Sequence, residues 1–264
     1  MYTGLALNLS KRTLKLQITT IYTPHTFTLP LVNGGTFDFI VAWGDGSTNT
    51  HITAYNVGNA HSYATPGTYT IMIWGVCTKF NFNASGSAPY VIKILDFVDT
   101  GLITLDFKGC TKLTIASNNI KRLNSLTNMP STFYGCTNLV NAPIIGTNVT
   151  GMFSTFQGCT NLVNAPTIPN KVTNMPSTFS GCTNLVNAPV IPANVTDMSS
   201  TFQGCTNLAG NITVVNIGVT SFTDCFTGCN ASIAKTLRCP TGSASYNLAF
   251  NICHGKNGVT LVAY

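Results

Sequence analysis

Residues 158–180 read GCTNLVNAPTIPNKVTNMPSTFS, and this stretch decides the fold because the chain repeats it. Its opening motif, Gly-Cys-Thr-Asn-Leu, begins at Gly135, Gly158, Gly181 and Gly204, so each copy is 23 residues long. The pattern Met-x-x-Thr-Phe-x-Gly-Cys leads into each copy. A period of about 20 to 29 residues with fixed apolar positions is typical of a solenoid, in which each coil buries its apolar residues by stacking on its neighbours.

The apolar positions of one coil recur every three or four residues, which predicts a short strand, two turns and a brief helical or 3₁₀ segment. Across coils they predict two buried ladders. These are Cys136, Cys159, Cys182 and Cys205, and Phe133, Phe156, Phe179 and Phe202. Equivalent side chains on coils about 4.8 Å apart point in parallel, so we expect free thiols that pack as small apolar groups instead of disulfides.

Small polar residues form rows in the same way. The Asn row is Asn138, Asn161, Asn184 and Asn207, and the Thr row is Thr137, Thr160, Thr183 and Thr206. We expect the Asn amides to bond from coil to coil, as amide ladders do in stacked strands. The Thr hydroxyls are freer to meet a ligand, so the Thr row is the candidate recognition site.

The repeat pattern resembles a known family. Cys-x-x-Leu-x-x-Ala-Pro-x-Ile-Pro-x-x-Val-x-x-Met-x-x-Thr-Phe-x-Gly-Cys is similar to the BspA-like leucine-rich repeat of microbial surface proteins, over roughly residues 92 to 240. The resemblance implies a right-handed solenoid with a recognition face, of the kind found in adhesins and in viral and phage proteins. Ala, Val and Met replace some of the usual Leu residues, so narrower coils are expected.

The first 80 residues follow a different pattern. Residues 37–43 and 68–74 alternate apolar and polar side chains, which predicts two strands, and a Gly-Asp-Gly turn follows the first. Trp43-Gly-Asp-Gly-Ser, then His61-Ser-Tyr, then Pro66-Gly-Thr-Tyr-Thr resemble the PKD family. That resemblance implies an immunoglobulin-like β-sandwich serving as a spacer or weak binding module, without catalysis.

Three parts are therefore expected in a mainly β fold. They are a PKD-like β-sandwich over 1–80, a BspA-like leucine-rich-repeat solenoid over 81–240, and a C-terminal cap over 241–264 that covers the last coil. Composition agrees with this class: the chain has 40 Thr, 28 Asn and no Glu. Thr favours strands, Asn favours turns, and long surface helices normally draw on Glu.

Charge is scarce, at 8% of 264 residues. The net charge is +6, but no run of basic residues is longer than two. A surface that binds the phosphates of a nucleic acid normally carries more clustered Lys and Arg, so no nucleic-acid partner is expected. No apolar run is long enough to span a membrane, and no standard export signal stands at the start of the sequence.

Catalysis and metal binding are not expected. The repeats between Met129 and Cys229 contain three charged side chains, and the four histidines are scattered, so no acid–base or nucleophilic site can be assembled from the repeats. Cysteines near the end of the chain, with His254, match no zinc-ligand spacing. Asp45, in the Gly-Asp-Gly turn, is interpreted as a turn residue. We therefore predict no enzyme activity, no cofactor and no metal.

Three functions fit a non-enzymatic protein displayed on a surface. The first is a virion decoration or fibre-type protein of a phage or virus, which mediates weak multivalent adhesion. The second is a BspA-like cell-surface adhesin, exported without a standard signal peptide. The third is an ice- or crystal-surface binder acting through the Thr row. The expected partners are other copies of the chain, a capsid, tail or cell-surface protein, and surface glycans.

Overall fold

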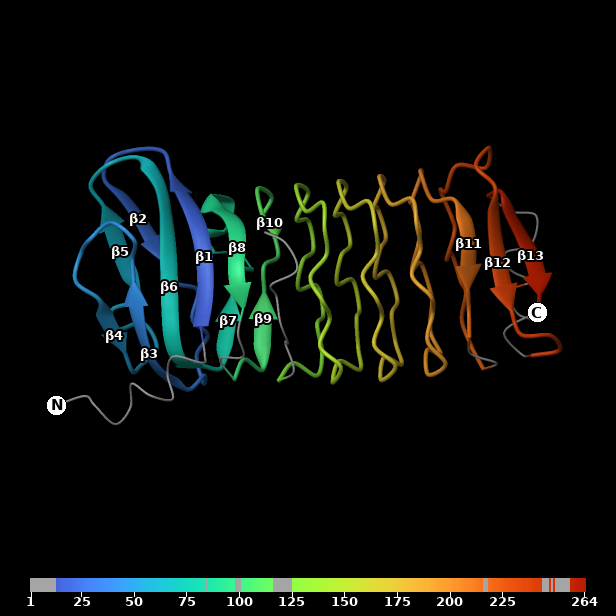
Figure 1. Cartoon of the computed structure of the whole chain (residues 1–264), viewed down its shortest axis with the longest axis horizontal. Helices are drawn as coiled ribbons and strands as arrows, with labels where there is room; N and C mark the ends of the chain where they lie inside the picture. Colours follow the sequence, from blue (N-terminus) through green and yellow to red (C-terminus); the bar gives the residue numbers. More distant parts are fainter. Residues whose placement is uncertain are drawn as a thin grey trace.

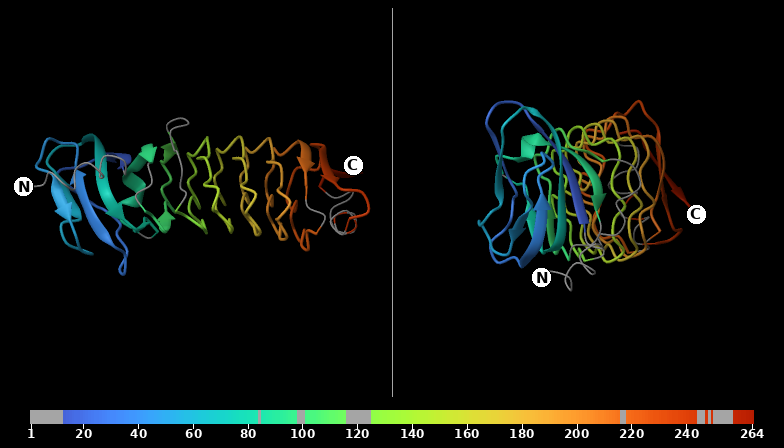
Figure 2. Two further views of the ribbon diagram at one scale, coloured as in Figure 1. Left: turned by 60° about the horizontal axis from the view of Figure 1, so that its bottom comes forward. Right: turned by 60° about the vertical axis from the view of Figure 1, so that its left-hand side comes forward.

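The computed structural model of the chain describes residues 13–83, 85–97, 101–115, 125–215, 218–243, 247, 249 and 257–264. The molecule is elongated and mainly β (Figure 1). Strands of the first hundred residues form one end, coils of the repeat follow along the long axis, and three strands lie at the other end. Figure 2 shows the coils stacked with nearly the same outline. The described residues contain no helix long and apolar enough to cross a bilayer.

Six strands form the N-terminal sheet, in the order β10-β8-β1-β6-β3-β4. All neighbours are antiparallel except β10 and β8. The strands are β1 (Thr13–Thr20), β3 (Phe37–Ala42), β4 (Thr50–Ile52), β6 (Gly67–Cys77), β8 (Val91–Phe97) and β10 (Thr114–Ile115). The strands predicted over 37–43 and 68–74 are confirmed as β3 and β6.

A second, two-stranded sheet pairs β2 (His25–Thr28) with β5 (Ala60–Tyr63). In β3, residues alternate between buried and partly exposed, so one face of the large sheet is in the core. The large sheet also extends past the boundary expected at residue 80, because β8 pairs with β1 and buries Val91 and Ile94. The immunoglobulin-like assignment of this part stays a prediction.

The solenoid begins with β7 (Lys79–Asn81), which pairs in parallel with β9 (Thr104–Asp106). The 3₁₀ helix η1 (Ala88–Tyr90) lies between these two strands in the chain. From residue 126 to 209 the described coils have turns and isolated bridges, such as Asn164↔Asn187, in place of the predicted short strand and helical segment. Proline explains the shortened strands. Pro166 and its equivalents lie two residues after a bridge and have no N–H to continue the ladder.

A left-handed serine marks the sharpest turn of every regular coil. Ser131, Ser154, Ser177 and Ser200 have φ between 52° and 54°. Each lies just before the Thr-Phe pair, and its backbone N–H donates to the next coil, as Ser177 does to the carbonyl of Ser199 at 2.8 Å. The left-handed conformation turns the chain so that the following Phe enters the core.

Stacked phenylalanine rings run through the core. Their centroids are 5.5–5.8 Å apart and neighbouring planes differ by at most 22°. The stack comprises Phe82, Phe107, Phe133, Phe156, Phe179, Phe202 and Phe226. Phe82 also packs against Phe27 of β2 and Phe80 of β7, so the N-terminal sheets and the solenoid share one continuous apolar core.

The C-terminal end is a parallel three-stranded sheet of β11 (Gly210–Thr213), β12 (Lys235–Cys239) and β13 (Val259–Ala263). β13 lies within residues 241–264, the segment expected to cap the last coil. Lys235 is buried under it, and its Nζ donates to the carbonyls of Asn230, Ile233 and Asn257 at 2.7–2.9 Å. These three bonds satisfy the ammonium group, whose pKa burial lowers.

Candidate binding surface of the repeats

The cysteine ladder is in the core and is not available to a ligand. Cys136, Cys159, Cys182 and Cys205 are fully buried free thiols. Each Sγ donates to the carbonyl of the Phe in the preceding coil, at 3.0–3.2 Å. Burial raises the pKa of these thiols well above the ordinary value, so they stay protonated and unreactive.

The Thr row, expected from the sequence to be free for a ligand, also links neighbouring coils through its hydroxyl groups. The Oγ1 hydroxyls of Thr137, Thr160, Thr183 and Thr206 each donate to the carbonyl of the Thr in the preceding coil, at 3.2–3.5 Å. The hydroxyl proton is therefore directed into the coil stack. What the row presents to solvent is the accepting side of each hydroxyl oxygen.

The Asn row forms a ladder beside it. Asn184 Nδ2 donates to Asn161 Oδ1, and Asn207 Nδ2 donates to Asn184 Oδ1, both at 3.3 Å. All four side chains of the row are exposed. Asn184 and Asn207 each use one of their two amide N–H donors for the ladder bond, which leaves the second for solvent. The turn rows, Thr and Asn together, thus repeat one acceptor and one donor per coil.

A second exposed surface follows each turn, and we call it the Val–Pro face. It consists of residues 140–145, 163–168, 186–191 and 209–215. One row of exposed side chains is Val140, Val163 and Val186, and a second row is Ile144, Thr167 and Val190, with Val215 exposed on the next coil. These segments read VNAPII, VNAPTI, VNAPVI and AGNITVV, without a charged residue.

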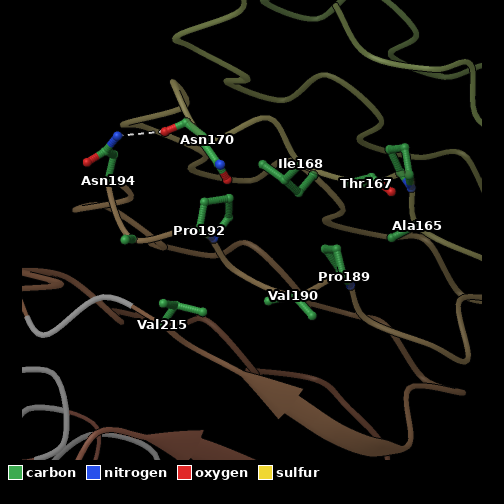
Figure 3. A pocket seen from close by; sticks show the side chains of 11 residues that line it. Ala165, Thr167, Ile168, Asn170, Pro189, Val190, Pro192, Asn194 and Val215 are labelled. Atoms are coloured by element: carbon green, nitrogen blue, oxygen red, sulfur yellow. Dashed lines mark hydrogen bonds between the residues drawn. The ribbon is translucent and has the colours of Figure 1, made fainter. Parts of the chain in front are cut away.

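A groove of about 620 Å³ lies at the C-terminal end of this face. Figure 3 shows Ile168, Val190 and Pro192 around it, with Asn170 and Asn194 together at one end. There Asn194 Nδ2 donates to the carbonyl of Asn170 at 2.6 Å. The remaining lining residues are Ala165, Pro166, Thr167, Pro189, Ala193 and Val215. The groove suits an apolar side chain and carries no group that could catalyse a reaction.

The sequence interpretation missed the Val–Pro face. Val follows the Leu of the repeat in three successive copies, and this periodicity was a usable signal, because a β-branched apolar residue next to a buried Leu must point outward in extended chain. The groove had a weaker signal. It depends on Val190 and Val215, which lie where the copies diverge.

Titratable groups gather in the N-terminal part at Asp45. Its carboxylate accepts bonds from the Ser47 backbone N–H and hydroxyl and pairs with His61 Nε2 at 2.7 Å. Burial alone would raise the pKa of Asp45, but the bonds from Ser47 and His61 outweigh it and lower the pKa to about 2. His61 stacks on Trp43 at 4.9 Å, so the pair fixes the turn after β3 against β5.

Within the described ranges, no group of three His, Cys, Asp or Glu side chains is arranged to hold a metal ion. His254, considered above as a metal ligand, lies outside those ranges, as does the adjacent Cys253. Asp45 is engaged as a turn residue by Ser47 and His61.

Comparison with known families finds a match over the repeats. The family model described as "Mycoplasma protein of unknown function, DUF285" matches residues 104–191 and 173–237. Together these segments span half of the chain. No curated protein matches the sequence.

Two solved structures of leucine-rich repeat proteins are similar to the chain. The protein from Bacteroides ovatus ATCC 8483 is 14% identical, with a TM-score of 0.43 over 88% of this chain and 77% of its own. The T. pallidum protein TpLRR is 21% identical, with a TM-score of 0.34 over 55% of this chain and 72% of its own.

Proposed function

The chain belongs to the DUF285 family, and from the surface of its repeats we propose that it is a non-enzymatic recognition protein displayed on a surface. The observation that carries this proposal is the pair of turn rows. They present neutral donors and acceptors once per coil, on a stack held rigid by buried Phe and Cys ladders. A rigid array of identical neutral groups suits repeated weak contacts and lacks the titratable groups that catalysis needs.

The ligand class follows from the same groups. An exposed amide N–H beside a hydroxyl oxygen that accepts matches a ligand that itself carries hydroxyl groups, so neutral surface glycans are the proposed ligand. Each contact contributes little, because both groups are well hydrated before binding. Useful adhesion therefore requires many copies side by side, and linking weak sites raises apparent affinity by about 10²–10⁴.

We place this function in a cell-surface adhesin of the BspA-like type. The family description names Mycoplasma, a cellular source, which favours the adhesin over a virion decoration or fibre protein. The virion role stays a prediction. The ice- or crystal-binding alternative is less favoured, because each Thr hydroxyl donates its proton to a backbone carbonyl of the stack, which leaves only the accepting side of the oxygen for a surface.

The test measures adhesion of beads that carry the full chain at high or low density to an array of neutral, sialylated and sulfated glycans. We expect binding to neutral glycans at high density only, unchanged between about 50 and 500 mM salt, since screening acts on charges that this surface lacks. Dense beads that bind no better than bare beads would reject the recognition function.

Matched variants locate the site. Asn161→Ala with Asn184→Ala removes two amides from the turn rows, and we expect adhesion to be lost. Asn170→Ala with Asn174→Ala removes two exposed amides of the same coil that lie outside the turn rows and should leave adhesion intact. Equal loss in both double variants would exclude the turn rows as the binding site.

A further inference from the structure

The Val–Pro face has the features of a protein interface. Ile144 is 56% exposed and Val190 is 60% exposed in one row of this face, with Thr167 between them, and Val163 in the neighbouring row is 36% exposed. Single exposed apolar residues are ordinary on a protein surface. Rows of them without a charged residue, as in the segments of this face, are characteristic of the covered core of an interface.

The coil repeat restricts what can cover this face. Its side chains recur once per coil, about 4.8 Å apart along the solenoid axis. A partner keeps every contact in register over several coils only if its own surface repeats at the same interval. A second copy of the chain meets that condition because its coils have the same spacing. The segments of this face are uncharged, so no like charges lie opposite each other in such a pair.

The two ends of the face are complementary to each other. Ile144 is exposed at its N-terminal end, and the groove lined by Ile168, Val190 and Pro192 lies at its C-terminal end. A two-fold axis perpendicular to the solenoid reverses one copy against the other. In that arrangement Ile144 of each copy meets the groove of its partner, which gives the same contact twice, as a symmetric dimer requires.

We propose that two copies of the chain dock antiparallel through their Val–Pro faces, with Ile144 of each copy seated in the partner's groove. Four coils by about six extended residues give a flat area on the order of 400 Å² per copy. The two copies together bury about 800 Å², which is below the roughly 1,000 Å² of a stable specific interface, so the dimer is weak and transient and forms only at high micromolar concentration or above. The turn rows stay uncovered, so this proposal does not depend on the proposed adhesion.

Sedimentation velocity of the full chain from about 5 to about 500 μM measures the association. We expect a concentration-dependent shift from monomer to dimer that salt leaves unchanged. Ile144→Asp and Val190→Asp should each weaken dimerisation at least tenfold. A chain that stays monomeric at the highest concentration would overturn the proposal, whatever the bead assay shows.

Two controls keep the result specific. Phe153 is also exposed but lies past the next turn of the coil, so Phe153→Ser should leave the dimer unchanged. Circular dichroism should show the Ile144→Asp and Val190→Asp proteins folded, because both side chains are on the surface. If these two variants dimerise like the parent chain, the interface is elsewhere and the proposal fails.

The antiparallel arrangement has its own test. Chains with Ile144→Cys mixed with chains with Val190→Cys should form cross-linked dimers faster than either chain alone, since the new thiols meet only across the mixed pair. The native cysteines described by the structure are buried and do not compete. Equal cross-linking rates in mixed and single solutions would contradict the antiparallel geometry.

Discussion

Ser177 adopts φ of 54°, a conformation that costs an L-residue roughly 1 kcal/mol or more, whereas glycine adopts it freely. We expect Ser177→Gly to raise the free energy of unfolding by up to about 1 kcal/mol. Ser180 is in the same turn with ordinary backbone geometry, so Ser180→Gly should lower it by about 0.5–1 kcal/mol. Urea denaturation distinguishes the two, and the same sign for both would refute the strain argument.

Asp45 gives the N-terminal part a dependence on pH. Its pKa in the folded protein, about 2, is below the ordinary value of 3.8, so the ionised carboxylate stabilises the fold above about pH 4. This stabilisation is lost as pH falls from about 4 to about 2. The melting temperature of Asp45→Asn should therefore be lower than that of the parent at pH 7, and the gap should close by about pH 2.

Asp38 provides the control for that prediction. It pairs with His51 at 2.8 Å, but both side chains are more than 40% exposed, and exposed pairs contribute little. Asp38→Asn should shift the melting temperature much less at any pH. A gap for Asp45→Asn that stays constant with pH would mean that the carboxylate charge has no role.

At the scale of the coil, the Phe ladder has strong and weak positions. Phe179 is fully buried between the rings of Phe156 and Phe202, whereas Phe226 ends the stack. Phe179→Ala should cost about 3–5 kcal/mol and Phe226→Ala clearly less. Chemical denaturation of both variants and the parent decides this, and equal stabilities would contradict the ladder.

The cysteine ladder predicts unreactive thiols. The raised pKa of each buried thiol keeps it neutral at pH 8, and only the thiolate reacts. A thiol reagent should find few reactive groups in the folded protein and most of the ten after denaturation without reductant. A count near zero after denaturation would indicate disulfides instead.

Much of the coil could be predicted from its sequence, because stacking places equivalent residues together. Cys159 and Phe179 follow directly from the period. The hydroxyl direction of Thr160 did not, since it depends on where the preceding coil presents a carbonyl. The strands are also shorter than predicted. Pro166 has no backbone N–H to donate to the neighbouring coil, and whether this ends a strand depends on the register between the coils.

Across the whole molecule, the shared core predicts one unfolding transition. Of the two tryptophans, Trp74 is in β6 and Trp43 directly follows β3, whereas the thiol ladder is in the solenoid. Tryptophan fluorescence and thiol exposure therefore report on opposite ends. We expect their denaturation midpoints to coincide, because Phe82 and Phe107 join the two cores. Two separated midpoints would show independent domains instead.

The near-identity of successive coils also bears on how chains of this type vary in length. A Cβ atom placed on Gly158 would lie 3.7 Å from the Cα of Gly135, and the same 3.7 Å recurs from Gly181 to Gly158 and from Gly204 to Gly181, so each interface is a copy of the last. A gene duplication or deletion of one 23-residue unit would rebuild the same interface and disturb neither end. The length of the solenoid, and the number of Thr and Asn residues in its turn rows, can therefore change in single heritable steps.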